Sequence, residues 1–323
     1  MRATCHHSSV QRRYCSGVLS LSHVTSIFLW VVAVALPLVL ALGSRDFVLQ
    51  LNSYREQPVV QFTNQVLCVL EGQRDDGGPL TLVHTTFPDR VQQLFLNESL
   101  QTAFVRTIST DVNVDGIDES VQVEIAVPLS TNEIIRQATV VVVLDYTLKS
   151  YAKLNMDVLT VFRHSSSVGG DTLYADGDLS FHQRSPLEIT ESMQQPYVNS
   201  PIVNMTNANT TQEMLMQSLV SKYRERNYTA NFHVPYPVWT PNGNSSEDIR
   251  VFRVLMNIRI DPVNVFYTPE WPEIIKYAWM QYYCIFIVVS TLAFALREYL
   301  FANKLLSSVC VVDEPRMKFV KYE

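Results

Sequence analysis

Residues 24–42 form an uninterrupted apolar stretch without a charged side chain, and this stretch constrains what the rest of the chain can be. As an α-helix it would be about 28 Å long, close to the hydrocarbon thickness of a bilayer. A helix in a soluble core normally keeps a polar stripe toward solvent, but the only polar residues here, Thr25 and Ser26, lie at one end. The stretch therefore predicts a membrane-spanning helix.

The alternative interpretation of this stretch is a cleaved signal peptide. The run is longer than the apolar core of a usual signal peptide, and residues 41–43 make a poor cleavage site. A second uncharged stretch at residues 277–296 favours a membrane protein, because it carries Trp279, Tyr282 and Tyr283 at one end. Aromatic residues of this kind concentrate at membrane interfaces. Two spans predict a hairpin with both chain ends on the same side.

Charge is distributed unevenly around the two predicted spans. The N-terminal tail has three Arg and no acid, the C-terminal tail has five basic and four acidic residues, and the middle has 17 basic and 27 acidic residues, a net −10. Basic residues favour the cytosol, so we expect both tails there and the middle in the lumen or outside the cell. The predicted parts are a tail at 1–23, a span at 24–43, a lumenal or extracellular domain at 44–274, a span at 275–296 and a tail at 297–323.

Glycosylation sequons support this topology independently of charge. All five lie between the spans, where the glycosylation machinery would find them. Cys68 is the only cysteine of the middle region, so an intrachain disulfide there is excluded and the domain must be stabilised by its core. The predicted N-glycosylation sites are Asn97, Asn204, Asn209, Asn227 and Asn244.

The middle region is predicted to fold as a mainly β, sandwich-like antiparallel domain with one or two short helices. Residues 121–127 are the clearest strand, because their odd positions are all apolar and share one face of a sheet. Many short strands separated by polar turns favour a sandwich over βαβ units. Strands are predicted at residues 59–70, 80–87, 101–108, 121–127, 139–148, 156–162, 251–260 and 263–267.

Local motifs predict the connections between these strands. Asp176-Gly177 predicts a type I′ hairpin turn, since both turn positions need positive φ. Ser130 and Glu133 have the spacing of a capping box and predict one helical turn. Residues 211–226 predict an amphipathic helix.

The segment from Asp111 to Glu119 has the spacing of a calcium-binding loop. Oxygen side chains at loop positions one, three and five converge on a hard cation where Gly116 permits a sharp turn. An acidic turn held by its own Asx hydrogen bonds fits the same residues, and both interpretations stay open. The candidate structural calcium ligands are Asp111, Asn113, Asp115, Ile117 and Glu119.

Catalytic motifs are absent from the sequence, so we expect no enzyme, no catalytic residue and no organic cofactor. The four histidines between the spans stand in no pattern with a nucleophile or a second metal ligand. Neither of the apolar stretches 24–42 and 277–296 contains Asp, Glu, Lys, Arg or His, which argues against ion conduction by this chain alone.

Several motifs, in order over residues 45–300, resemble the transmembrane protein 231 family. They are Tyr54, Glu56, Gln57 and Pro58 after the first span, Asp111-x-Asn113-x-Asp115-Gly116, residues 174–179, Tyr223 to Asn227 with Arg224, Glu225 and Arg226, and Trp279 at the second span. Ordered matches of this length are specific. The motif residues are candidates for a partner surface, with a role in the core or in helix capping as the alternative.

The resemblance implies a non-enzymatic membrane component of the ciliary transition zone. The family belongs to the Tectonic-like, Meckel-syndrome complex, which helps to form the diffusion barrier of the cilium and is needed for ciliogenesis. Tectonic proteins, meckelin and other membrane proteins of that complex are the implied partners. Two other classes fit the residues alone: a cell-surface adhesion or receptor module, and an accessory subunit of a membrane transporter.

Overall fold

The structure is a computed structural model, and it describes residues 12–15, 20–44, 47–87, 99–202, 212–241, 250–307 and 309–312. It divides into two units. We call the first, Met1–Gln50 with Glu270–Glu323, the helical unit, and the second, Leu51–Pro269, the β domain.

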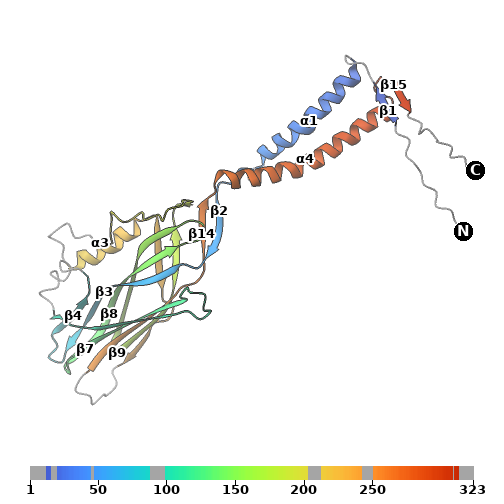
Figure 1. Cartoon of the computed structure of the whole chain (residues 1–323). Coiled ribbons are helices and arrows are strands. Elements are labelled where there is room, and N and C mark those ends of the chain that lie inside the picture. The colour runs from blue at the N-terminus through green and yellow to red at the C-terminus, as the bar shows by residue number, and fades with distance from the viewer. Residues whose placement is uncertain are drawn as a thin grey trace, which may run out of the picture. The chain divides into compact units, whose positions relative to one another are not determined.

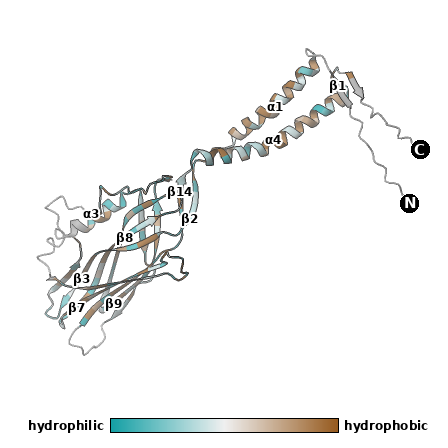
Figure 2. Ribbon diagram, in the orientation of Figure 1, coloured by the Kyte–Doolittle hydropathy of each residue, from teal (hydrophilic) through white to brown (hydrophobic). Residues whose placement is uncertain are grey.

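Two long apolar helices make up most of the helical unit. α1 (Leu21–Gly43) and α4 (Trp271–Ala302) are both long and apolar enough to cross a membrane. Hydrophobic residues follow both helices along their length (Figure 2). At 1.5 Å per residue they extend about 35 and 48 Å, so each exceeds the hydrocarbon core.

α1 contacts α4 through small residues. Ala33, Pro37 and Ala41 are buried and recur every four residues, so they form one stripe on α1. Small residues let two helix backbones approach closely in a membrane. The Tyr282 hydroxyl of α4 donates a hydrogen bond of 3.4 Å to the Val34 carbonyl, beside the turn that Pro37 interrupts.

Short strands lie outside the two helices. β1 (Arg12–Cys15) precedes α1, β15 (Val309–Val312) follows α4, and the two pair antiparallel. The segments before α1 and after α4 therefore lie side by side (Figure 1), as a two-helix hairpin requires.

The β domain is built mostly of antiparallel strands, as the sequence predicts. Each predicted strand is confirmed, although several are longer than expected. The strands are β2 (Asn52–Glu56), β3 (Val59–Arg74), β4 (Pro79–Thr85), β5 (Ser99–Leu100), β6 (Phe104–Thr110), β7 (Ser120–Leu129), β8 (Glu133–Leu148), β9 (Leu154–Gln183), β10 (Leu187–Glu188), β11 (Tyr228–His233), β12 (Val238–Pro241), β13 (Arg250–Arg259) and β14 (Val263–Thr268).

The long strand β9 organises the larger sheet. Its first part pairs antiparallel with β8, and its second part pairs parallel with β13 and antiparallel with β11 and β12. The order is β5-β4-β3-β8-β9-β13-β7-β6, and a smaller sheet has the order β10-β14-β2. β9 thus links the β3-β8 part of the sheet to the β13-β7 part.

The middle of β8 is buried on both faces. Val140 and Val142 on one face join the main core, which also receives side chains from β3, β7, β9 and β13. Val141 and Val143 on the other face join a second cluster beneath α3 (Gln212–Arg224). This double burial explains an apolar run without alternation, whereas β7 alternates because only one of its faces is buried.

α3 confirms the amphipathic helix predicted at residues 211–226. Leu219 and Tyr223 are buried in the second cluster, against the outer face of β3, β4 and β8. The Tyr223 hydroxyl accepts a hydrogen bond of 2.7 Å from the Ala230 amide and donates one of 2.9 Å to the Ala230 carbonyl. α3 is thereby held by a hydrogen-bonded contact to β11 as well as by packing on β3, β4 and β8.

The hairpin predicted at Asp176-Gly177 is wrong, because both residues lie inside β9. A Cβ at Gly177 would lie 2.3 Å from the His233 carbonyl oxygen, so glycine is needed for the close approach of β11 and not for a turn. Asp176 pairs with Arg259 across the neighbouring strand.

The helical turn predicted at Ser130 and Glu133 is also wrong. The segment is a tight turn between β7 and β8, and Glu133 is already the first residue of β8. The reciprocal hydrogen bond of the motif still forms, since the Ser130 amide donates to the Glu133 carboxylate at 2.9 Å. β7 pairs with β6 and β13, and β8 pairs with β3 and β9. This pairing of both flanking strands outweighs the local helical signal.

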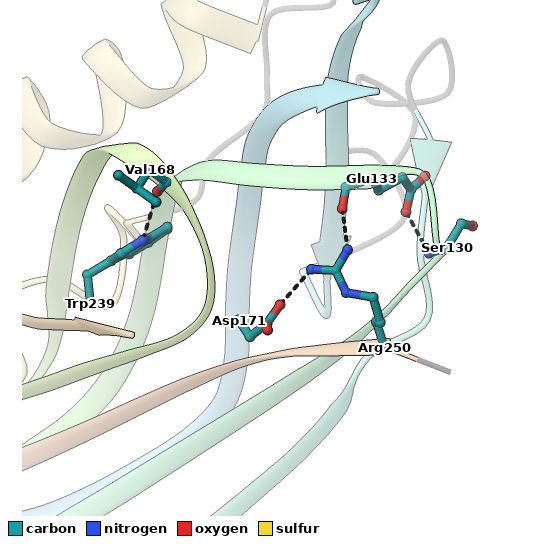
Figure 3. Close-up of polar contacts among 6 residues, drawn as sticks. All are labelled: Ser130, Glu133, Val168, Asp171, Trp239 and Arg250. Atoms are coloured by element: carbon teal, nitrogen blue, oxygen red, sulfur yellow. Dashed lines mark hydrogen bonds and ion pairs between the residues drawn. The ribbon is translucent and has the colours of Figure 1, made fainter. Parts of the chain in front are cut away.

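Arg250 holds a corner where this turn meets β9. Its guanidinium donates to the Glu133 carbonyl at 3.1 Å and to the Asp171 carboxylate at 2.7 Å (Figure 3). The Trp239 indole donates to the Val168 carbonyl at 3.1 Å in the same region of β9 (Figure 3). These contacts tie β8, β12 and β13 to β9 at the point where β9 changes its partners.

Candidate functional site

The acidic loop predicted as a calcium site connects β6 to β7. Carboxylate oxygens of Asp111, Asp115 and Glu119 all lie within 4.8 Å of one another. Gly116 has φ of +86°, which is the sharp turn that the sequence predicts. Three carboxylates at this spacing are a donor set that suits a hard divalent cation.

Backbone amides already bind most of these side-chain oxygens. The two carboxylate oxygens of Asp111 accept hydrogen bonds from Val114 and Gly116 at 2.7 and 2.9 Å. The Glu119 carboxylate accepts one from Val112 at 2.6 Å. Each carboxylate oxygen has a second lone pair, so these bonds pre-form the loop without preventing a cation from binding. The residues fit calcium, and the sequence prediction stays a prediction.

Tyr54 of the first family motif connects β2 to the turn between β8 and β9. Its hydroxyl accepts a hydrogen bond from the Ala152 amide at 3.1 Å, and its ring packs against Tyr151 and Tyr267 with centroids 5.7 and 5.6 Å away. Burial raises the pKa of the Tyr54 phenol to about 12. The side chain therefore binds within the domain.

The neighbouring motif residues hold the same turn. One Glu56 carboxylate oxygen accepts hydrogen bonds from the Lys149 and Ser150 amides at 2.7 and 2.8 Å. Gln57 is half-buried and Pro58 is buried. These positions match a role in the core and in a turn, which is the alternative that the sequence leaves open.

The family motif at Tyr223 to Asn227 begins in the last turn of α3, and its two arginines differ in their contacts. The Arg226 guanidinium donates to the carbonyls of Asp157 at 3.3 Å and Ser200 at 2.6 Å, and it lies 4.3 Å from the centroid of the Tyr197 ring. Partial burial lowers the pKa of Arg226. Arg224 and Glu225 are exposed.

The remaining predicted site residues are spread over both units. Trp279 of α4 is 65% exposed and its ring centroid lies 6.1 Å from that of Tyr282. Among the sequons, Asn227 is exposed in the turn between α3 and β11. Four predicted glycosylation sites lie outside the described residues: Asn97, Asn204, Asn209 and Asn244.

Comparison with known proteins assigns the family. The family model described as Transmembrane protein 231 matches residues 1–310, which include both long helices and the whole β domain. The chain belongs to the transmembrane protein 231 family. Family members are named as membrane proteins, in agreement with the two apolar helices of the helical unit.

Relatives of this family match the chain over nearly its full length. Transmembrane protein 231 of Homo sapiens is 28% identical over 310 residues, covering 95% of this chain and 94% of the relative. The Mus musculus protein is 28% identical over 305 residues, covering 94% and 93%. A solved proton-activated chloride channel superposes with a TM-score of only 0.29 at 7% identity, covering 87% of this chain and 99% of that chain, too low to indicate a shared fold.

The sequence analysis missed two arginines whose binding partners are far away in the sequence. Arg250 binds Asp171, 79 residues away, and Arg184 donates to the Arg224 carbonyl at 2.7 Å, 40 residues away. No local motif surrounds Arg250 or Arg184. Strand pairing brings Arg250 to Asp171, and the packing of α3 beside the end of β9 brings Arg184 to Arg224.

Proposed function

We propose that the protein is a non-enzymatic membrane component of the Tectonic-like complex at the ciliary transition zone. There it contributes to the diffusion barrier that controls ciliary membrane composition, and to ciliogenesis. The family match over residues 1–310 carries the proposal, because it includes the helices and the β domain together. Tectonic proteins, meckelin and other membrane proteins of the complex are the proposed partners.

The arrangement of the chain suits a component of such a barrier. The β domain is connected at both its ends to long apolar helices, so two spans would hold it at the membrane surface. In the proposed topology both tails are cytosolic, and the β domain is lumenal or extracellular and glycosylated. The basic N-terminal tail and the acidic middle region support this orientation.

Histidine contacts in the β domain support a role without catalysis. The His84 imidazole Nδ1 accepts a hydrogen bond from the Ala103 amide at 3.2 Å, and the His164 ring packs against Trp239 at 5.6 Å between centroids. Both rings take part in packing between strands. The names of the relatives describe a membrane protein and no reaction.

Localisation in native ciliated cells tests the proposal. A tag on either tail is expected to give a ring at the base of each cilium, and an unrelated two-span protein with the same tag serves as the control. Removal of the chain is expected to let other membrane proteins enter the cilium and to reduce the number of cilia.

Two outcomes would contradict the transition-zone role. A uniform plasma-membrane signal would favour the adhesion or receptor module. Cilia that keep their number and membrane composition after removal of the chain would leave the adhesion module or the transporter subunit as the better explanation.

A further inference from the structure

A groove runs between α3 and the outer face of β8 and β9. Its volume is about 650 Å³. Val161 of β9 and Met216 and Val220 of α3 give it an apolar floor, and all three are partly buried. A cavity of this size is within the range of small-ligand sites and is large enough for a bulky side chain with its flanking backbone.

Three arginines line the same groove. Arg163, Arg184 and Arg224 come from β9, the segment after β9 and the end of α3, while Glu225 is the one acidic residue in the lining. This local excess of positive charge stands out in a middle region that has 17 basic and 27 acidic residues. The groove therefore attracts negative charge although the domain as a whole repels it.

The three arginines of the groove have two roles. One stabilises the groove by a hydrogen bond, and the guanidinium groups of the other two can bind a ligand. Arg184 donates to the Arg224 carbonyl at 2.7 Å, which fixes the end of α3. Among the described residues, the guanidinium groups of Arg163 and Arg224 have no hydrogen bond or ion pair. A guanidinium group presents a fork of donors that matches a carboxylate.

The family motif is therefore split between two roles. Arg226 is held by the carbonyls of Asp157 and Ser200, so it is a structural residue. Arg224, two positions earlier, lines the groove with a free guanidinium group. A motif used only for capping would not require a second arginine that faces a groove.

We propose that this groove binds an acidic segment of a partner protein. One apolar side chain of that segment lies on the floor formed by Val161, Met216 and Val220, and flanking carboxylates pair with Arg163 and Arg224. The combination of an apolar floor with a positive rim selects this chemistry over a purely anionic or purely apolar ligand. The inference rests on the groove alone and is independent of the transition-zone assignment.

Selection from a displayed library of random twelve-residue peptides tests the groove on the full chain in detergent micelles. Peptides with an apolar residue between Asp or Glu residues are expected to be enriched. Their affinity is expected to fall about tenfold or more for Arg163→Glu/Arg224→Glu. The matched control, Arg106→Glu/Arg253→Glu, makes the same charge change at exposed positions on β6 and β13 and is expected to bind normally.

A charge exchange completes the test. Peptides whose acidic residues are replaced by Lys should regain affinity for Arg163→Glu/Arg224→Glu, and Val220→Ser should weaken wild-type peptides without changing their charge preference. Thermal melting of each variant checks that it folds. Failure to enrich acidic peptides, equal binding to the arginine and control variants, or arginine-dependent binding of a heparin oligosaccharide in place of a peptide would each overturn the proposal.

Discussion

Gly177 shows how one missing side chain allows β9 and β11 to pair. Gly177→Ala would place a methyl group 2.3 Å from the His233 carbonyl oxygen, and backbone atoms cannot move away as a side chain can. We expect a loss of about 2 kcal/mol in the free energy of unfolding, a cost typical of overpacking. Thermal unfolding of the full chain in micelles measures it.

Gly78→Ala is the matched control for this substitution. The nearest atom to its new methyl group is a carboxylate oxygen of Asp76 at 3.1 Å, at the end of an exposed and flexible side chain. The melting temperature should change little. Equal losses at the two glycines would contradict the role of close strand approach at Gly177.

Tyr54→Phe tests the contact between β2 and the β8–β9 turn. Loss of the hydrogen bond to the Ala152 amide should cost about 1 kcal/mol at pH 7. Burial raises the pKa of Tyr54 to about 12 from 10, so the unfolded chain releases this proton at a lower pH than the folded chain. Wild-type stability therefore falls as the pH rises from 10 to 12, and the gap to the variant should narrow there.

Chemical denaturation at several pH values measures this narrowing. Tyr151→Phe is the control, because Tyr151 is 57% exposed and contributes its ring to the same cluster. A gap between wild type and Tyr54→Phe that stays constant from pH 7 to 12 would contradict the buried phenol.

Single residues mark the limit of what the sequence predicts. Cys68 lies inside the strand predicted at residues 59–70 and is fully buried, because residues 66–70 of that strand are all apolar. For Asp176-Gly177 the sequence signal is the same whether glycine serves a turn or a close approach, and only β11, some 55 positions later, decides. Tyr54 and Arg226 were identified by resemblance, but their contacts to Ala152 and Asp157 depend on the complete fold.

At the scale of elements, Arg250 stabilises the region where β9 changes its partner strands, because it binds both β8 and β9. Arg250→Met removes two hydrogen bonds and leaves the half-buried Asp171 carboxylate without its partner. We expect a loss of about 2 kcal/mol, below the value for fully buried pairs because the Asp171 side chain is 25% exposed. Arg253→Met changes an exposed arginine in the same strand and should stay within about 0.5 kcal/mol of wild type.

A double variant separates the ion pair from general damage at this corner. Arg250→Met/Asp171→Leu should recover part of the lost stability, because no unpaired charge remains. Urea denaturation of the wild type, Arg250→Met, Asp171→Leu and the double variant gives the coupling energy. Additive losses would show that Arg250 and Asp171 do not act as a pair.

Calcium binding at the β6–β7 loop is expected to stabilise the folded chain. Calcium at ten times its dissociation constant would stabilise the folded chain by about 1.4 kcal/mol, and extracellular sites have dissociation constants of about 0.1–1 mM. We expect the melting temperature of chelator-treated full chain to rise by about 3–6 °C in millimolar calcium. Asp115→Asn/Glu119→Gln should abolish the rise, and Asp118→Asn, outside the carboxylate cluster, should keep it. If the melting temperature of the wild type does not change with calcium, the calcium site is contradicted and the loop is an acidic turn held by its own Asx hydrogen bonds.

An element can be predicted from the sequence when nearby residues determine it, and it is missed when distant strands determine it. β7 and α3 were predicted because one buried face gives a clear period of 2 or 3.6 along the chain. β2 was not predicted, because its exposed positions alternate with half-buried ones and its partner β14 begins more than 200 residues later. Within β9, residues 156–162 were predicted as a strand and the second half was predicted wrongly as a hairpin, because that half obtains its partners from β11, β12 and β13.

At the scale of the whole molecule, the charge distribution and the paired segments β1 and β15 bear on topology. β1 precedes α1 and β15 follows α4, and they pair antiparallel, so both tails leave the helix pair on one side of the membrane. In the proposed topology that side is the cytosol, and the positive-inside bias supports it, since the N-terminal tail has three Arg and no acid. The opposite assignment would place the −10 middle region in the cytosol and its five sequons beyond the reach of glycosylation.

Tags at both termini test this orientation directly. In sealed microsomal vesicles that contain the newly made chain, added protease should remove both tags and leave the glycosylated, lumenal β domain intact. Asn227, exposed after α3, should carry a glycan that Asn227→Gln removes, seen as a smaller shift on glycosidase treatment. Asn231→Gln, an exposed Asn outside any sequon, should leave the shift unchanged. Protection of both tags together with a chain that lacks glycans would reverse the proposed topology and place the arginine groove on the cytosolic side, and protection of one tag alone would contradict the two-span hairpin.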